Sequence, residues 1–330
     1  MIITKTPFRM SFFGGGTDME DYFKENGGAV ISTTFDKYCY VNVRHLPRFF
    51  DYSTELSYSK TERVTDVKDI QHPAIREAMK MLDMHEIRLT YEADLPARSG
   101  LGTSSSFAVG MLNAFYALKG KYADKRKLAD EAIYLERVLC DEAGGWQDQI
   151  ATSFGGFNRI EFNSDGYEVR PIIISPERKR QLNDNLMMFF TGFTRFSSEL
   201  QKVNNVSGTE DKRKKLKQMY ELVNEAEQVL VNKDLDDFGR LLDITWKLKK
   251  GTGSAISTGS IDELYEKGMH AGALGGKLLG AGGGGFLLFY VQPKKQKAVR
   301  EAMSDLMYIP FKFENTGTQV IHYTPEPYEK

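Results

Sequence analysis

A run of small residues that leads directly into a helical pattern constrains this chain more than any other feature of its sequence. Residues 99–105 read Ser-Gly-Leu-Gly-Thr-Ser-Ser, and from Thr103 apolar residues recur at helical spacing as far as Leu118. Glycines let backbone N–H groups approach a ligand closely, and a helix start presents unpaired N–H groups at the positive end of its dipole. The run therefore predicts a loop that holds a phosphate chain, with hydroxyl groups able to reach a cation bridging the phosphates.

Two further glycine clusters, at residues 14–16 and 280–285, strengthen this prediction. A tight turn would explain any one cluster, but three clusters, one of them at a helix start, favour nucleotide binding. The chain contains no G-x-x-x-x-G-K-[ST] pattern, which excludes a Walker-type P-loop. Residues 280–285 match G-x-G-x-x-G, yet we expect a helix before them and a strand after them, the reverse of the order in a dinucleotide-binding unit.

Two acidic residues are candidates for chemistry. Glu136 falls on the apolar face of the helix expected over residues 124–140. A carboxylate turned inward needs a partner, which is either an Arg or Lys side chain or a Mg²⁺ ion that also contacts phosphate oxygens. Asp148 lies in a short turn after Gly144 and Gly145, where an acid either caps the following turn or acts on a substrate. The residues alone leave both choices open.

The order of the expected elements predicts an α+β fold with two domains. A length of 330 residues is more than one typical core holds. Strands are expected at residues 2–6, 9–13, 29–33, 38–44 and 87–92, with a helix at 72–82, and two helices follow from Thr103. We take the polar residues 175–184 as the linker and predict domains over 1–178 and 179–330. The second domain is expected to contain strands at 186–191 and 286–291 and helices at 209–231, 235–249, from Ile261 and at 293–306.

Charge and cysteine content exclude several classes of partner. Lys and Arg total 44 against 45 Asp and Glu, a net charge of −1, so no overall field attracts nucleic acid or an anionic membrane. The two cysteines, Cys39 and Cys140, cannot make a disulfide framework, and the five histidines lack the spacing of a zinc site. The longest compact apolar run, residues 286–291, is far shorter than a membrane span. We expect a cytoplasmic protein with small-molecule partners.

Three segments together resemble the motifs of the GHMP kinase superfamily, which includes galactokinase and the homoserine, mevalonate and phosphomevalonate kinases. Residues 7–18 (Pro-Phe-Arg-Met-Ser-Phe-Phe-Gly-Gly-Gly-Thr-Asp) are similar to the first motif, residues 95–105 to the second and residues 277–286 to the third, in the family's order. The resemblance implies an N-terminal domain like ribosomal protein S5 domain 2, joined to a ferredoxin-like C-terminal domain. It also implies an ATP-dependent kinase.

The resemblance assigns roles to individual residues. It implies that Ser104 and Glu136 bind Mg²⁺ and that Asp148 takes the proton of the acceptor hydroxyl. It places Arg9 near the transferred phosphoryl group and Asp18 on sugar hydroxyls. The implied ATP-binding residues are Pro96, Ser99, Gly100, Leu101, Gly102, Thr103, Ser104 and Ser105. The implied acceptor-binding residues are Gly14, Gly15, Gly16, Thr17, Asp18, Gly282 and Gly283.

Within the superfamily, residues 14–18, 246–250 and 272–277 are similar to bacterial heptose-phosphate kinases, which phosphorylate the anomeric hydroxyl of D-glycero-α-D-manno-heptose 7-phosphate. Fucose kinases share the Gly-Gly-Gly-Thr-Asp form, so a neutral-sugar kinase is the alternative. The polar loop around Asp18 disfavours a mevalonate-type acceptor. A non-catalytic sensor of sugar and ATP would not need the base and the metal ligands that this chain keeps. A phosphate on the acceptor needs local positive charge; the candidates are Arg195, Lys247 and Lys250, although a solvated role also explains each.

Overall fold

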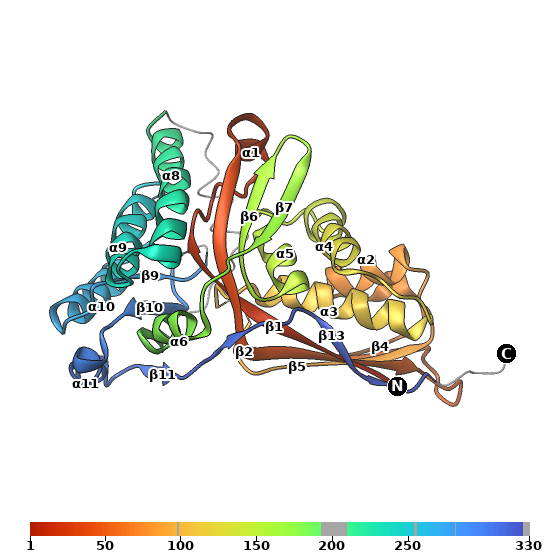
Figure 1. Ribbon diagram of the computed structural model, residues 1–330. Coiled ribbons are helices and arrows are strands. Elements are labelled where there is room, and N and C mark those ends of the chain that lie inside the picture. The colour runs from red at the N-terminus through yellow and green to blue at the C-terminus, as the bar shows by residue number, and fades with distance from the viewer. Residues whose placement is uncertain (98, 193–209, 254–255, 281, 326–330) are drawn as a thin grey trace.

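The computed structural model describes residues 1–97, 99–192, 210–253, 256–280 and 282–325. Two sheets organise the chain, one large and one small, and helices cover them (Figure 1). In Figure 1 the large sheet and the first helices lie on the right, and the small sheet with the last helices lies on the left. None of the helices in these described ranges is long and apolar enough to span a membrane.

The large sheet is built around two long strands, β1 (Ile2–Phe13) and β2 (Gly28–His45). Each replaces a pair of shorter strands expected from the sequence. The break expected near Pro7 is only an irregularity in the register between Pro7 and Phe8, which lets β1 continue past a residue that cannot donate to the ladder. The strands run in the order β13-β1-β2-β5-β3-β4, and β6 and β12 pair with β2. The other strands of this sheet are β3 (Thr54–Ser57), β4 (Thr61–Val64), β5 (Ile87–Ala93), β6 (Phe157–Asn163), β7 (Gly166–Pro171), β12 (Phe313–Glu314) and β13 (Gln319–Tyr323).

Helix α3 (Thr103–Leu118) follows the predicted phosphate loop. It begins at Thr103, as predicted from the sequence. Nearly all of its residues are buried, because it packs on β1 and β2 and is covered by neighbouring helices. The other helices of this half are α1 (Glu20–Asn26), α2 (Pro73–Met81), α4 (Lys125–Tyr134) and α5 (Gln147–Phe154), with a 3₁₀ turn η1 (Val67–Asp69) and a π-helical turn η2 (Leu135–Leu139). The helix predicted over 124–140 is thus α4 followed by a widened last turn.

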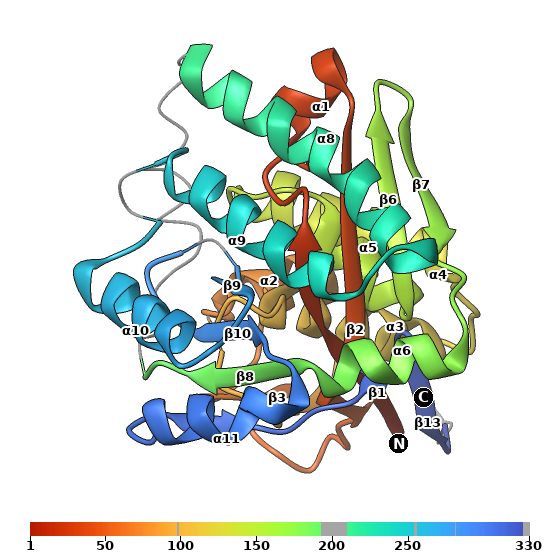
Figure 2. The same ribbon diagram turned by 60° about the vertical axis from the view of Figure 1, so that its left-hand side comes forward.

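The small sheet is antiparallel in the order β11-β8-β10-β9. Its strands are β8 (Leu186–Phe190), β9 (Gly275–Leu278), β10 (Phe286–Tyr290) and β11 (Met307–Ile309). The helices are α6 (Pro176–Asp184), α8 (Glu210–Asn232), α9 (Asp236–Lys250), α10 (Gly259–His270) and α11 (Pro293–Ala302). Helices α8 and α9 lie side by side against the bent ends of β1 and β2 (Figure 2).

The two halves are joined more closely than the sequence suggests. The expected linker is helix α6, which Ser175 caps by accepting a hydrogen bond from the Arg178 N–H. One apolar core runs through both halves, with the ring of Phe238 on α9 packed 5.3 Å from that of Phe12 and 5.0 Å from that of Phe13. Strands β12 and β13 return to the large sheet. The boundary at residue 178 stays a prediction, and residues 313–323 pack with the first half rather than the second.

Candidate active site

A cavity of about 1050 Å³ lies where the two halves meet. Its walls come from the ends of β1, the loop before α3, the start of α5, helices α8 and α9, and the segment after β9. All three glycine-rich segments contribute to it, together with both acids singled out in the sequence, Glu136 and Asp148. The structure therefore brings the predicted motifs together at one place.

The loop before α3 presents a subset of its predicted residues to the cavity. Gly102 adopts a left-handed conformation, with φ of +71°, and turns the chain into the helix. The residues that line the cavity are Gly100, Gly102, Thr103, Ser104 and Ser105. Pro96 is exposed and lies outside the cavity, whereas Ser99 and Leu101 are buried in the protein. Pro96, Ser99 and Leu101 were predicted to bind ATP. They belong to the loop but do not line the cavity.

The third glycine cluster supports this loop by backbone contact. A Cβ atom on Gly100 would lie 2.3 Å from the Leu279 carbonyl oxygen, and one on Gly285 would lie 2.3 Å from the Ser99 carbonyl oxygen. Gly282 and Gly283, predicted to bind the acceptor, do not line the cavity. They pack on Ile256, whose carbonyl oxygen accepts a hydrogen bond of 3.0 Å from the Gly283 N–H. A Cβ on Gly282 would lie 2.6 Å from the Ile256 carbonyl oxygen, so this glycine permits close packing of the chain. Residue 281 lies outside the described residues.

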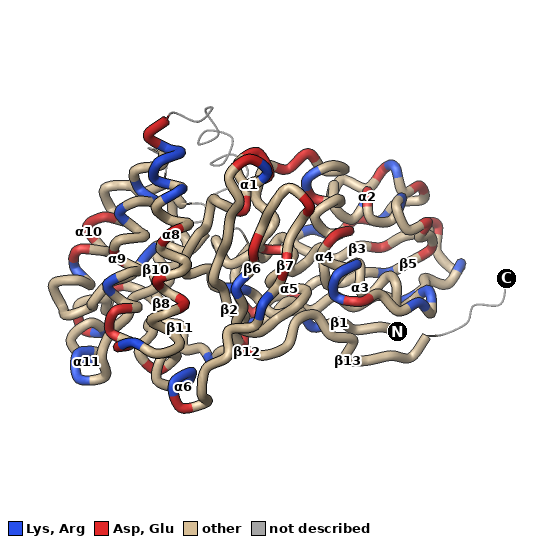
Figure 3. Tube along the Cα trace, turned by 45° about the horizontal axis from the view of Figure 1, so that its top comes forward, with Lys and Arg blue, Asp and Glu red and all other residues tan. Residues whose placement is uncertain are grey.

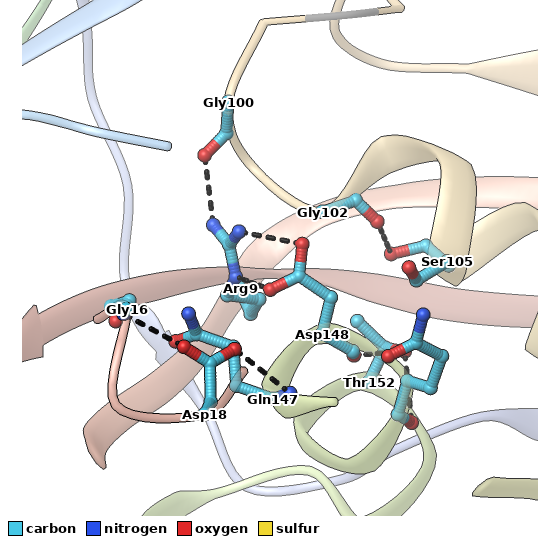
Figure 4. A network of polar contacts seen from close by, with 12 residues as sticks. Arg9, Gly16, Asp18, Gly100, Gly102, Ser105, Gln147, Asp148 and Thr152 are labelled. Atoms are coloured by element: carbon cyan, nitrogen blue, oxygen red, sulfur yellow. Dashed lines mark hydrogen bonds and ion pairs between the residues drawn. The ribbon is translucent and has the colours of Figure 1, made fainter. Parts of the chain in front are cut away.

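Arg9 and Asp148 form a buried pair at the centre of the site (Figure 4). Arg9 Nε and Nη2 each donate to one oxygen of Asp148, both at 2.7 Å, and Nη1 donates to the Gly100 carbonyl oxygen at 2.8 Å. The Arg9 side chain is 4% exposed, whereas that of Asp148 is 25% exposed. Asp148 lies in the first turn of α5 rather than in a glycine-flanked loop. Its carboxylate is therefore fixed by Arg9 and remains open to the cavity.

Glu136 is buried, as predicted, with only 1% of its surface exposed. It sits in the π-helical turn after α4, and its Oε1 accepts from Ser104 Oγ at 2.8 Å while Oε2 accepts from Ser105 Oγ at 2.7 Å and from Gln149 Nε2. The Arg137 guanidinium is 3.8 Å away. The Glu136 carboxylate is thus held by the hydroxyl groups of the first turn of α3.

The residues around Glu136 fit a magnesium ion. Its carboxylate and the Ser104 hydroxyl are hard oxygen donors 2.8 Å apart, close to the separation of about 2.9 Å between neighbouring ligands of an octahedral Mg²⁺. Both residues line the cavity beside the start of α3. Across the described ranges, no group of three or more His, Cys, Asp and Glu side chains could hold a metal by itself. An ion here would take the remaining ligands from phosphate and water, which is how Mg²⁺ usually binds with nucleotides.

The first glycine cluster forms the opposite wall. Gly15, Gly16 and Asp18 line the cavity, whereas Gly14 and Thr17 are inside the turn, where a Cβ on Gly14 would meet the Ala29 carbonyl oxygen at 1.8 Å. Asp18 Oδ1 accepts from the Gly16 N–H at 2.8 Å, and Oδ2 accepts from the Gln147 N–H at 3.3 Å. Burial raises the pKa of Asp18, and the charge of nearby Asp148 acts in the same direction.

Polar groups that the sequence did not single out complete this wall. The hydroxyl of Ser11 and Oε1 of Gln147 are buried and have no hydrogen-bond partner within the described protein, and both residues line the cavity. A Cβ on Gly15 would lie 3.7 Å from Ser11 Oγ and 3.6 Å from Gln147 Nε2, so the two side chains flank this glycine. Gln147 precedes Asp148 and Ser11 lies two residues after Arg9, but no spacing pattern distinguishes them from ordinary core or helix residues.

Two lysines, Lys277 buried and Lys249 half-buried, also line the cavity. Lys277 Nζ donates to the Ser11 and Phe12 carbonyl oxygens, each at 2.9 Å, and Lys249 Nζ donates to the Gly15 carbonyl oxygen at 3.2 Å. Burial lowers the pKa of Lys277 to about 7, and it lowers the pKa of Lys249 against the opposing charge of Asp18. No pattern in the sequence distinguishes them from Lys247 and Lys250. Only their position on β9 and on one side of α9 sets them apart.

Two of the cations predicted to border the site, Lys247 and Lys250, lie elsewhere. Lys247 pairs with Asp243 at 2.7 Å and is 66% exposed, and Lys250 pairs with Asp262 at 2.8 Å; neither lines the cavity. The reason is helical geometry, because Lys249 faces the cavity and its neighbours on α9 point away from it. Arg195 lies outside the described residues.

Comparisons with known proteins agree with this architecture. Models of the GHMP kinases N-terminal domain and of the GHMP kinases C-terminal region match residues 69–156 and 222–309, together just over half of the chain. The chain belongs to the GHMP kinases. As a GHMP kinase it is an ATP-dependent phosphotransferase with an alcohol group as acceptor, and the predicted α+β fold class is confirmed.

Individual relatives of this GHMP kinase cover nearly its whole length. It is 28% identical to D-glycero-alpha-D-manno-heptose 7-phosphate kinase of Campylobacter jejuni over 96% of this chain and 98% of that protein. It is 26% identical to L-fucokinase/L-fucose-1-P guanylyltransferase of Bacteroides fragilis over 90% of this chain and 35% of that longer protein. The crystal structure of a D-glycero-D-manno-heptose 1-phosphate kinase from Bacteroides thetaiotaomicron has a TM-score of 0.78 at 23% identity, covers 98% of this chain and 99% of its own, and shows the shared fold.

Proposed function

We propose that this GHMP kinase transfers the γ-phosphoryl group of ATP to the anomeric C1 hydroxyl of a sugar phosphate, D-glycero-α-D-manno-heptose 7-phosphate. The product would be the 1,7-bisphosphate, an intermediate on the way to GDP-heptose for surface polysaccharides. The relative from Campylobacter jejuni, named for the same acceptor, supports this assignment because the two chains align over almost their full lengths.

The position of the Arg9–Asp148 pair carries the proposal. On one side, Arg9 is bonded to the Gly100 carbonyl oxygen, and a Cβ on Gly102 would lie 3.5 Å from Asp148 Oδ2, so the pair touches the loop expected to hold ATP. On the other side, the charge of Asp148 acts on Asp18 in the acceptor loop. A carboxylate between the two substrates can orient the acceptor hydroxyl and take its proton, while the guanidinium faces the charge that develops on the transferred group.

The phosphate loop supplies backbone N–H groups that stabilise negative charge on the phosphate groups. The N–H groups of Thr103, Ser104 and Ser105 precede the first hydrogen bond of α3, which the Ser106 N–H makes to the Gly102 carbonyl oxygen. Phosphoryl transfer depends mainly on positioning and on stabilising the equatorial oxygens of the transferred group. Ser104 and Glu136 would hold Mg²⁺, which neutralises phosphate charge when bound.

The cavity wall formed by Ser11, Gly15, Gly16, Asp18 and Gln147, here called the acceptor wall, is suited to a molecule with many hydroxyl groups. Asp18 accepts hydrogen bonds, the Ser11 hydroxyl both donates and accepts, and Gln147 Oε1 accepts; the last two have unused capacity within the described protein. Buried polar atoms without partners are costly unless a ligand satisfies them. An apolar acceptor would leave these atoms unpaired, whereas a sugar would satisfy them.

A neutral-sugar kinase of the fucose type is the second candidate, supported by the relative from Bacteroides fragilis. The deciding experiment incubates the protein with Mg-ATP and a panel of heptoses, heptose phosphates, fucose and galactose, and follows ADP release. The position of the new phosphate is then determined by NMR. We expect the highest kcat/KM with the heptose 7-phosphate and phosphorylation at C1; a higher kcat/KM for fucose would overturn the proposal.

A further inference from the structure

Lys249 is a half-buried cation that forms no ion pair among the described residues. Its ammonium group donates to the Gly15 carbonyl oxygen at 3.2 Å, and the charge of Asp18 acts on it from farther away. An ammonium group has three donor hydrogens, so the single carbonyl leaves capacity for a further acceptor. A cation that is partly withdrawn from water and makes one neutral hydrogen bond is suited to bind an anionic group of a ligand.

Lys249 faces the cavity on the acceptor side of the first glycine cluster. A Cβ on Gly16 would lie 3.5 Å from Lys249 Nζ, whereas a Cβ on Gly15 would lie 3.6 Å from Gln147 Nε2, the neighbour of Asp148. The Gly15-Gly16 turn is therefore flanked by Gln147 at Gly15 and by Lys249 at Gly16. An acceptor lying along this turn would have its reacting hydroxyl at Asp148 and its far end at Lys249.

Two further cations stand at the same end of the cavity. Lys212 and Arg213, on the first turn of α8, line the cavity beside Leu216, and the charge of Lys212 acts on Lys249. Figure 3 shows basic positions in blue near the start of α8. Arg213 makes a long ion pair of 3.6 Å with Glu25, and both side chains are more than half exposed. Asp21 is an acidic lining residue nearby. A dianionic group entering here would meet three cations, of which Arg213 is exposed and Lys249 and Lys212 are half-buried.

We propose that Lys249, assisted by Arg213 and Lys212, forms the subsite that binds the phosphate already present on the acceptor. This inference rests on the proposed function and names the part of the site that selects a sugar phosphate over a neutral sugar. The subsite is remote from the reacting oxygen, so its contribution is to binding and alignment and not to proton transfer. It replaces Lys247 and Lys250 as the expected phosphate contacts.

The test compares D-glycero-D-manno-heptose 7-phosphate with the same heptose lacking the phosphate, in the wild type and in Lys249→Met. We expect the wild type to have the lower KM for the phosphorylated acceptor. The substitution should raise that KM on the order of 10- to 100-fold, because a charge-assisted hydrogen bond is lost. The KM values for the neutral heptose and for ATP should change by less than about twofold.

Two other variants keep the test decisive. Lys247→Met removes a cation from the same helix but outside the cavity, and it should leave all three KM values unchanged. Arg213→Gln alters an exposed side chain, so it tests the subsite even if Lys249→Met does not fold; it should raise the KM for the phosphorylated acceptor alone, by a smaller factor.

The outcomes separate the two proposals. If the wild type prefers the phosphorylated heptose but Lys249→Met and Arg213→Gln affect both acceptors equally, the subsite is wrong and the proposed function stands. If the wild type uses both acceptors equally well, the protein does not recognise the phosphate. The second candidate, a neutral-sugar kinase, then replaces both proposals. If it phosphorylates neither acceptor while another sugar in the panel is used, the proposed function itself is wrong.

Discussion

Charged side chains have different kinds of partner at the two ends of the cavity. At the phosphate-loop end, Arg9 is paired with Asp148 through two hydrogen bonds, and Glu136 accepts from Ser104, Ser105 and Gln149. At the acceptor end, Lys249 and Lys277 donate only to backbone carbonyl oxygens within the described protein. The charged side chains of one end are paired with side chains, whereas the cations of the other bond to neutral carbonyl oxygens and keep capacity for a ligand.

This difference separates the two tasks of a kinase. Groups that act on the transferred phosphoryl must be in place before it arrives, because reorganisation during the reaction adds to the barrier. Groups that select the acceptor gain discrimination by being costly when unpaired, since the wrong ligand leaves them so. The comparison makes four predictions, given from the largest expected effect to the smallest.

Replacing Asp148 with Asn should have the largest effect. The amide keeps the size of the side chain but cannot take a proton or neutralise Arg9, so kcat should fall about 10²- to 10⁴-fold with little change in ATP affinity. Steady-state kinetics and a calorimetric ATP titration measure the two quantities. Asp237→Asn, an exposed acid at the start of α9 that pairs with Arg240, is the control. Near-normal turnover in Asp148→Asn would remove this residue from the mechanism.

Replacing Gly100 with Ala tests whether the phosphate-loop end is held rigidly by backbone packing. Gly100 has φ of +84°, and a Cβ there would meet the Leu279 carbonyl oxygen at 2.3 Å. Gly120 has φ of +66° with no atom within 4 Å, so Gly120→Ala carries the same backbone strain without the clash. Gly100→Ala should lower the free energy of unfolding by about 1–3 kcal/mol more than Gly120→Ala. Equal losses in urea denaturation would mean that the two loops are free to move apart.

Replacing Glu136 with Gln should weaken metal binding at the phosphate-loop end. A neutral amide is a poorer ligand for a hard cation, so the Mg²⁺ concentration giving half-maximal activity should rise by about tenfold or more. Glu131→Gln is the matched control, because this carboxylate on α4 bonds to the Tyr116 hydroxyl and does not line the cavity. An unchanged Mg²⁺ titration together with lower thermal stability would assign Glu136 to a structural role.

The acceptor end should make stability depend on pH through Lys277. Burial lowers the pKa of this lysine from 10.5 in the unfolded chain to about 7, and the charges of Lys249 and Arg9 add to the effect. Between these values the unfolded state binds more protons, so the free energy of unfolding should rise with pH, by at most about 1.4 kcal/mol per pH unit. Below about pH 7 the dependence on this group should disappear.

Lys277→Met removes the titrating group and provides the comparison. The free energy of unfolding of the wild type minus that of the variant should increase between about pH 7 and about pH 9, as measured by urea denaturation at each pH. A constant difference over this range would show that Lys277 keeps its ordinary pKa, and that the acceptor end is better solvated than its burial indicates.

Local sequence patterns predict those features of the site that depend on residues close together in the sequence. The start of α3 at Thr103 and the burial of Glu136 both follow from spacing along a helix, and the structure confirms them. The partners of Glu136 could not be derived in this way. They come from α3 and α5, and no periodicity shows which loops a fold brings together.

The differences between these predictions and the structure have physical reasons of the same kind. Lys249 and Lys247 are two residues apart in a run of basic residues, and only the packing of α9 against β9 decides which one faces the cavity. Residues 175–184 are polar enough to suggest a linker, but a Ser cap, a following proline and contacts with the end of α8 make them a helix. Gly282 and Gly283 looked like ligand contacts because close packing and ligand approach require the same residue.

The return of the chain to its starting point has a consequence for how this enzyme is made. Strand β13 pairs with β1, bringing Ile2 opposite Tyr323, and β12 pairs with β2. The edge of the large sheet at β1 therefore stays open during synthesis until residues 319–323 have left the ribosome. Pairings of such long sequence separation form slowly, and an unpaired edge strand is prone to association with other chains. A nascent chain of this kinase would be exposed to aggregation at this edge until β13 is made.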